Sequence, residues 1–227
     1  EEILIRSGNI GSVRIAEKVG IENYNEFLQT IGIISNLEFD IQEVGTTQLG
    51  RWGKCKLATV AFGHGIATTL LQLSKGYSII SNGGYEIRPT LLKREILQRK
   101  RILNENLSEK INPILRKIVS TKEGTASFAN VKGYEIGGKT GTADQPSNGG
   151  YSKKKVNTFA SVFPTSDPKF VLAVMLDEPK ANREFVYHYR DDRYPYKGNW
   201  RNTAGWTTVW VTGQIMDKIG PILATKY

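Results

Sequence analysis

The stretch Tyr134–Ala143 reads Tyr-Glu-Ile-Gly-Gly-Lys-Thr-Gly-Thr-Ala, and at this point the chain changes from a helical to an extended pattern. Two more extended runs follow, Val156–Pro164 and Lys169–Asp177, and only the four residues 165–168 separate them. Extended runs bounded by turn residues are typical of strands. Because short connections join antiparallel neighbours, the pattern predicts an antiparallel meander of three strands.

Helical patterns lie on both sides of these strands. Apolar residues recur at helical spacing in Asn9–Val19, which Gly20 ends, and a second short helix is expected over Tyr24–Ile31. Helices then strands then a helix predict an α+β domain, with helices packed on an antiparallel sheet. Further helices are expected within Leu57–Ile80, after a Gly-rich bend, and over Ile114–Val119 and Ala204–Ile219.

We expect one domain with four parts. Residues 1–125 are mainly helical, residues 126–180 form the strands, residues 181–202 are a loop and residues 203–220 form the C-terminal helix. A hydrophobic content of 39% over 227 residues suffices for a core of this size.

Composition limits the classes of function. The net charge of +9 suits an acidic partner, but the basic clusters Lys93–Arg101 and Lys153–Lys155 fit no nucleic-acid motif, so we expect no nucleic acid and interpret the clusters as solvated faces and a loop. Such a surface would equally suit an anionic cell envelope. The single Cys55 excludes an internal disulfide, and with only His64 and His188 besides, no spaced set of ligands suggests a structural zinc. No apolar run approaches the roughly 18 to 20 residues of a membrane-spanning helix.

The residues Lys139-Thr140-Gly141-Thr142 form a candidate site for an anionic ligand. A lysine supplies a cation, threonine hydroxyls can donate to a carboxylate, and a glycine leaves room for a substrate backbone. An edge strand can also pair with an extended peptide. Taken alone, the Lys-Thr-Gly triplet is better explained as part of an ordinary strand and turn.

A second candidate is Ser7-Gly8-Asn9, which opens the first predicted helix. Serine and asparagine are both common N-caps, so capping alone would explain either residue.

Together with their order along the chain, these motifs and others resemble class B penicillin-binding proteins, which are serine D,D-transpeptidases of peptidoglycan. Two of the stretches, Val174–Lys180 and Thr203–Trp206, resemble the cell-division branch. The other stretches that carry the resemblance are Ser7–Gly11, Phe62–Ala67, Thr69–Leu73, Ser81–Gly84 with Arg88-Pro89, and Glu123–Ala126.

The resemblance implies a role for each candidate residue. Ser7 would relay a proton between the active-site lysine and the leaving amine, and Asn9 would bind the substrate peptide and hold that lysine. Lys139, Thr140 and Thr142 would bind the terminal carboxylate of a D-Ala-D-Ala stem peptide or of a β-lactam. The backbone N–H of Thr142 would form half of the oxyanion hole, and Gly141 would admit the substrate backbone.

The chain departs from the family in one respect. The family carries a nucleophile in Ser-x-x-Lys before the Ser-x-Asn element. The only plausible match here, Ser152-Lys153-Lys154-Lys155, instead follows Lys-Thr-Gly, in a Gly-rich stretch that reads as an exposed turn. We interpret it as a false match and expect the nucleophile on a segment N-terminal to Ser7. The chain would then be the C-terminal part of a transpeptidase domain, with a fold incomplete at its N-terminus and no activity alone.

The resemblance further implies septal peptidoglycan cross-linking and divisome partners that include a lipid II glycosyltransferase. It implies an upstream helix, outside this chain, that anchors the protein in the bacterial inner membrane, with this domain in the periplasm. It implies no metal and no organic cofactor. The alternatives are a D,D-carboxypeptidase, a β-lactam-sensing homologue and a non-catalytic binding module. Without the N-terminal segment, the apolar run Phe170–Leu176 would be an open sheet edge and the helix Ala204–Ile219 would lose part of its packing surface. We expect the isolated chain to dimerise through this strand or this helix, to aggregate, or to need the missing segment to hold it together.

Two other features have competing interpretations. His64, between glycines, could be a catalytic base, but we favour a structural role in its loop. The segment Arg183–Arg201 interleaves aromatic and basic residues, which would suit single-stranded nucleic acid, but we favour a partner-contact or lid loop.

Overall fold

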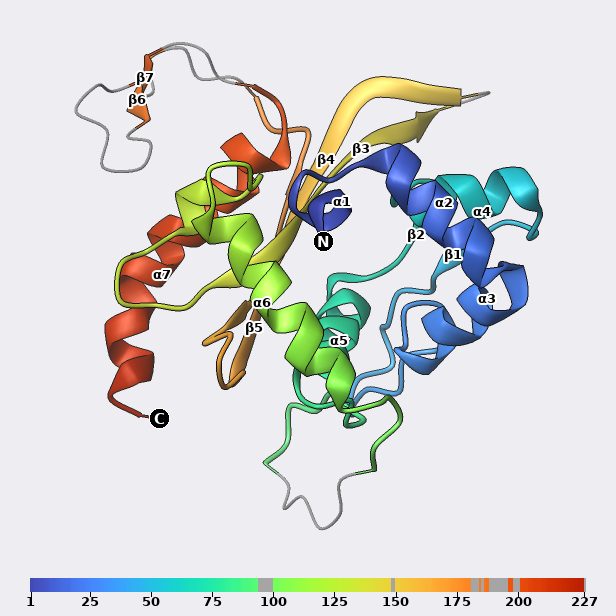
Figure 1. Ribbon diagram of the computed structural model, residues 1–227, viewed down its shortest axis with the longest axis horizontal. Coiled ribbons are helices and arrows are strands. Elements are labelled where there is room, and N and C mark those ends of the chain that lie inside the picture. Colours follow the sequence, from blue (N-terminus) through green and yellow to red (C-terminus); the bar gives the residue numbers. More distant parts are fainter. Residues whose placement is uncertain are drawn as a thin grey trace. The chain divides into compact units, whose positions relative to one another are not determined.

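A computed structural model describes residues 1–93, 100–147, 150–180, 184, 186–187, 196–197 and 201–226. The chain divides into two units, Glu1–Asn112 and Pro113–Tyr227. The expected mixture of helices with an antiparallel sheet is confirmed (Figure 1).

The first unit is mainly helical. The helix predicted over Asn9–Val19 is confirmed with the same bounds, and Gly20, with φ +82°, joins it directly to the next helix. A glycine suits this join because a side chain is strained at positive φ. The core contains Leu28, Ile31, Val60 and Ile79. The elements of this unit are α1 (Glu2–Ile5), α2 (Asn9–Val19), α3 (Ile21–Thr30), β1 (Gln48–Leu49), α4 (Lys54–Ala61), β2 (Ile66–Ala67), α5 (Leu70–Ser81) and the first part of α6 (Asn106–Ser120).

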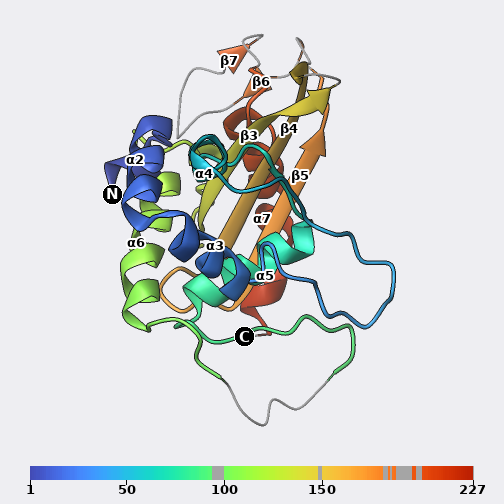
Figure 2. The same ribbon diagram turned by 90° about the vertical axis from the view of Figure 1, so that its right-hand side faces the viewer.

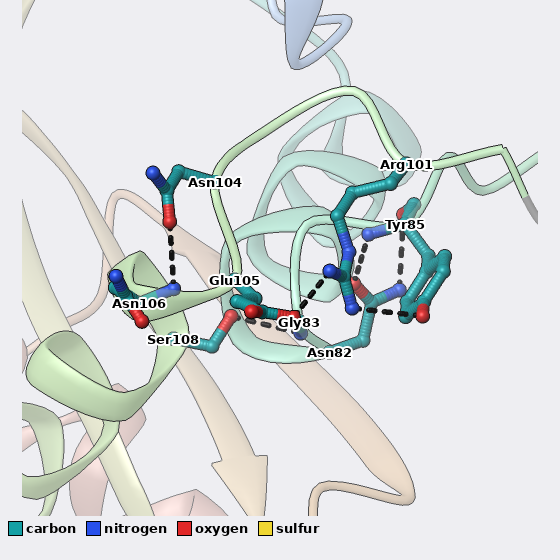
Figure 3. A network of polar contacts seen from close by, with 8 residues as sticks. All are labelled: Asn82, Gly83, Tyr85, Arg101, Asn104, Glu105, Asn106 and Ser108. Carbon is teal, nitrogen blue, oxygen red and sulfur yellow. Dashed lines mark hydrogen bonds and ion pairs between the residues drawn. The ribbon is translucent and has the colours of Figure 1, made fainter.

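Polar contacts hold both ends of α5. At its start, Thr69 and Gln72 form a reciprocal capping box. At its end, the Asn82 side chain bonds both the N–H and the C=O of Tyr85, and the Gly83 N–H donates to the Ser108 hydroxyl at 2.8 Å (Figure 3). Arg101 lies over the Tyr85 ring, 4.7 Å from its centroid, and pairs with Glu105. This network ties the turn after α5 to the start of α6 within the first unit.

The second unit is built on the predicted meander. Strands β3 (Gly137–Ser147), β4 (Gly150–Phe163) and β5 (Phe170–Asp177) are antiparallel and lie in that order. Helix α7 (Thr208–Ala224) runs along the sheet (Figures 1 and 2) and contacts β4 and β5. The short 3-10 helices η1 (Ser127–Ala129) and η2 (Ala204–Trp206) pack against it. The fully buried side chains of this unit include Ile118, Val119, Ile136, Phe159, Val162, Val209 and Met216.

The strand β5 ends the sheet formed by the described residues, as expected for an edge. None of its residues is fully buried, and Met175 is 47% exposed. The Glu178 N–H donates to the Lys155 carbonyl in β4 at 2.9 Å. Because successive strand residues direct their backbone groups to opposite sides, Val171, Ala173 and Met175 direct theirs away from β4.

The expected loop at residues 181–202 is described only in part. Two short strands, β6 (Val186–Tyr187) and β7 (Tyr196–Lys197), pair with each other inside it. Most of Arg183–Arg201 lies outside the described residues, so the partner-contact interpretation of that segment stays a prediction.

Candidate active site

The residues that the sequence singled out lie on an edge strand, β3. It ends the described sheet on the side opposite to β5. Lys155 bonds to the residue after β5, so alternate residues of β4, among them Thr158, direct their backbone groups toward β3. Gly141 is opposite Thr158 and therefore faces β4. The N–H and C=O of its neighbours Thr140 and Thr142 then face away from β4. The side chains of both threonines lie on one face of the strand, because they are two residues apart. This edge can therefore present two N–H donors and two hydroxyls together.

Each of the two hydroxyls has a partner within the second unit. The Thr142 Oγ1 accepts a hydrogen bond from the Ala204 N–H at 2.9 Å, at the start of η2. The Thr140 Oγ1 lies 2.8 Å from the Thr125 Oγ1, and either hydroxyl can be the donor. The Thr140 hydroxyl is thus held by a residue 15 positions away in the chain, and the Thr142 hydroxyl by one 62 positions away.

A buried amide supports the segment that holds Thr142. Asn157 is opposite Thr142 in β4 and is fully buried. Its Nδ2 donates to the Asn202 Oδ1 at 2.9 Å and to the Thr207 Oγ1 at 3.0 Å, on either side of η2. These bonds fix η2 against the sheet and thereby fix the Ala204 donor.

Lys139 is mostly enclosed by protein. Its Nζ donates to the Thr140 carbonyl at 3.1 Å. Burial lowers the pKa of its ammonium from the ordinary 10.5 to about 8, because the charged form is partly desolvated. Such a lysine is still mainly cationic at neutral pH, and it can give up its proton far more readily than a surface lysine.

Three glycines of β3 differ in their surroundings. A Cβ on Gly138 would lie 2.5 Å from the Ala160 carbonyl oxygen, and one on Gly137 would lie 2.5 Å from the Thr165 Cγ2. These two glycines are required by packing. At Gly141 the nearest atoms of the chain would be 3.9 Å away, so the space beside it is not filled by the protein itself. That difference fits a glycine that leaves room for a ligand.

Ser7 and Asn9 lie in the first unit, at the start of α2. The capping alternative does not apply to either residue, because Gly8 is the N-cap and makes no side-chain capping bond. Ser7 has φ +57°, which is uncommon for a residue with a side chain, and both Ser7 and Asn9 are exposed. Positive φ at a non-glycine residue concentrates at functional sites, so this conformation favours a role beyond folding.

A model of the penicillin binding protein transpeptidase domain matches residues 1–192. The chain belongs to this family.

Curated relatives agree with this assignment. A probable peptidoglycan D,D-transpeptidase FtsI of Caulobacter vibrioides is 28% identical over 239 residues, covering 99% of this chain and 38% of that protein. Stage V sporulation protein D of Bacillus subtilis is 31% identical over 201 residues, covering 81% of this chain and 31% of that protein. This chain thus spans less than two fifths of the length of either relative.

Solved structures show the same fold. The transpeptidase domain of Burkholderia pseudomallei penicillin-binding protein 3 has a TM-score of 0.80 at 24% identity, covering 97% of this chain and 63% of that domain. Penicillin-binding protein 3 of Mycobacterium tuberculosis, complexed with ampicillin, has a TM-score of 0.77 at 24% identity, over 96% of this chain and 50% of that one. The penicillin-binding protein transpeptidase fold expected from the sequence is confirmed.

Within this member of the family, the predicted site residues fall into two groups. Lys139, Thr140, Gly141 and Thr142 are contiguous on β3 of the second unit, whereas Ser7 and Asn9 belong to the first unit. Thr125 and Ala204 had no assigned role in the sequence, although both lie in stretches that resemble the transpeptidases. The resemblance of those stretches was the signal that could have pointed to Thr125 and Ala204, but nothing in their sequence indicated a contact with β3.

The Ser152-x-x-Lys155 residues lie in a strand and not in the turn that was expected. Residues 150–163 form β4, so that expectation of a turn was wrong. The Lys154 Nζ pairs with Glu178 at 2.7 Å, and the Lys155 Nζ pairs with Asp144 at 2.6 Å. A lysine committed to a carboxylate is a poor base for a serine, which agrees with a false match.

Two absences hold for the part of the chain that the structure describes. No three His, Cys, Asp or Glu side chains gather there as a metal site would require. Over the same residues, no helix is long and apolar enough to cross a membrane.

Proposed function

We propose that this chain supplies the substrate-binding strand of a serine D,D-transpeptidase that cross-links peptidoglycan. One observation carries the proposal: the edge of β3 presents the N–H groups and hydroxyls of Thr140 and Thr142 next to the mostly buried cation of Lys139. Membership of the transpeptidase family supports the same activity.

In this proposal, the terminal carboxylate of a D-Ala-D-Ala peptide binds the hydroxyls of Thr140 and Thr142. The cation of Lys139 lowers the free energy of the bound anion, and its effect is enlarged by partial burial. The ligand backbone extends along the edge of β3, where Gly141 leaves space for it. A β-lactam carboxylate would bind in the same place.

The acyl transfer then proceeds in two steps. A serine oxygen attacks the carbonyl carbon of the penultimate D-Ala, and the Thr142 N–H donates to the resulting oxyanion. The C–N bond breaks, and the leaving D-Ala amine takes a proton relayed through Ser7, while the Asn9 amide holds the peptide. The amine of a neighbouring stem peptide attacks the acyl-enzyme and releases the serine. The order of family motifs puts this nucleophile N-terminal to Ser7.

The proposal extends to the cellular role of the protein. Relatives named FtsI support septal cross-linking in cell division, with divisome proteins, including a lipid II glycosyltransferase, as partners. We further propose that the single transpeptidase domain lies on the periplasmic side of the inner membrane, anchored outside the present sequence.

Lys139→Ala tests the site in the gene product that contains this chain. Removing the cation should slow acylation by labelled penicillin about a hundredfold, because charged hydrogen bonds contribute about 1.5 to 3 kcal/mol. Lys132→Ala, at an exposed lysine of the same unit, is the matched control and should acylate normally. The 227-residue chain alone should form no adduct. Unchanged acylation in Lys139→Ala would refute the role of β3.

A further inference from the structure

The hydroxyls of Thr125 and Thr140 form one hydrogen bond with each other, and either of them can be its donor. At a separation of 2.8 Å the two oxygens share one hydrogen bond, so one hydroxyl donates and the other accepts. The direction decides what Thr140 can offer to a ligand. If Thr140 donates to Thr125, it turns lone pairs toward the ligand; if Thr125 donates, the Thr140 proton is free to be donated.

A carboxylate ligand requires the second direction. Carboxylates only accept hydrogen bonds, so the Thr140 hydroxyl must donate to bind one. A chain that runs from Thr125 to Thr140 to the carboxylate also polarises each of its bonds, which strengthens the bond to the anion. Thr142 has this arrangement already, because its oxygen accepts from the Ala204 N–H, which can only donate.

Thr125 is held firmly enough to act in this way. A side chain on Gly124 would collide with the Ile118 carbonyl, and one on Gly205 would lie 2.7 Å from the Thr125 carbonyl oxygen. The Ala126 N–H donates to the Ile118 carbonyl at 3.1 Å. The backbone around Thr125 is therefore packed closely between the end of α6 and η2, and its hydroxyl is brought to Thr140 before any ligand binds.

We propose that Thr125 is a positioning residue for the carboxylate site. It donates its hydroxyl proton to the Thr140 oxygen and so makes Thr140 a donor to the ligand carboxylate, without touching the ligand itself. The inference rests on the proposed function, since it assumes that Thr140 binds a carboxylate.

The test compares an acid ligand with its neutral ester. Acylation rates are measured in the gene product that contains this chain, with benzylpenicillin and with benzylpenicillin methyl ester. The variants are Thr125→Val, which keeps the shape and removes the hydroxyl, and Thr125→Ser, which keeps the hydroxyl. Thr121→Val is the matched control: it removes a threonine hydroxyl that donates to the Lys117 carbonyl at 2.7 Å, four residues earlier in the chain.

We expect Thr125→Val to slow acylation by the acid about tenfold while leaving the ester unchanged, so that the acid-to-ester ratio falls about tenfold. Thr125→Ser and Thr121→Val should retain the wild-type ratio within about twofold. A loss in Thr125→Val that is equal for acid and ester, or no loss at all, would overturn the inference while the proposed function stands. Failure of the wild-type protein to be acylated by the acid would instead overturn the proposed function and the inference with it.

Discussion

The desolvated ammonium of Lys139 should make the second unit less stable than it could be. The pKa of this group falls from 10.5 to about 8 on folding, and each pKa unit corresponds to about 1.4 kcal/mol, so the charge costs roughly 3 kcal/mol at pH 7. Lys139→Met removes the charge and keeps an unbranched apolar stem. It also removes the hydrogen bond from Nζ to the Thr140 carbonyl, which contributes about 1 kcal/mol. The variant should therefore be more stable at pH 7, by at most roughly 2 kcal/mol.

The pH dependence identifies the cause. The folded chain binds the Lys139 proton less tightly than the unfolded chain does, so the stability of the wild type rises with pH. The destabilisation is fully present below about pH 8 and is lost as the pH approaches 10.5. At pH 10 less than about 1 kcal/mol remains, and the advantage of Lys139→Met should almost disappear.

Urea denaturation of the chain labelled with 5-fluorotryptophan provides the assay. The Trp206 ring packs edge to face on Phe128 within the second unit, with ring centroids 5.5 Å apart, so its fluorine signal reports the unfolding of that unit. The exposed Lys153→Met in β4 is the control and should change stability by less than about 0.5 kcal/mol. Equal stabilities of wild type and Lys139→Met at pH 7, or a difference that does not shrink by pH 10, would refute the reasoning.

Two further predictions concern the sheet. Gly138→Ala should destabilise the second unit by roughly 2 to 3 kcal/mol in urea denaturation, because its Cβ would lie 2.5 Å from the Ala160 carbonyl oxygen; Gly141→Ala, with no atom nearer than 3.9 Å, should have little effect, and equal losses would contradict the packing argument. The isolated chain should associate through the edge of β5 in light scattering, and Met175→Lys should weaken this, whereas the exposed Ile222→Lys on α7 should not. A wild-type chain that stays monomeric would disprove the edge contact.

Local patterns in the sequence determined the elements and the family of this protein. The spacing of apolar residues and the stop at Gly20 were enough to place α2, because helix periodicity and a positive φ are properties of short segments. The three strands and their antiparallel order followed from short turns between extended runs. The Lys-Thr-Gly residues were found for the same reason, since a contiguous motif survives in sequence whatever surrounds it.

The environment of those residues was decided only by tertiary structure. Nothing local pairs Thr140 with Thr125 or Thr142 with Ala204, because these hydrogen bonds join segments that packing brings together. The lowered pKa of Lys139 has the same origin, since desolvation depends on the protein around a charge and not on its neighbours in sequence. Ser152 was expected in a turn and lies in β4, because pairing with β3 extends the strand beyond its apolar run. Sequence thus identifies the groups that a ligand would contact. Packing decides the hydrogen-bond partners of the hydroxyls and the free energy of desolvation of the lysine charge.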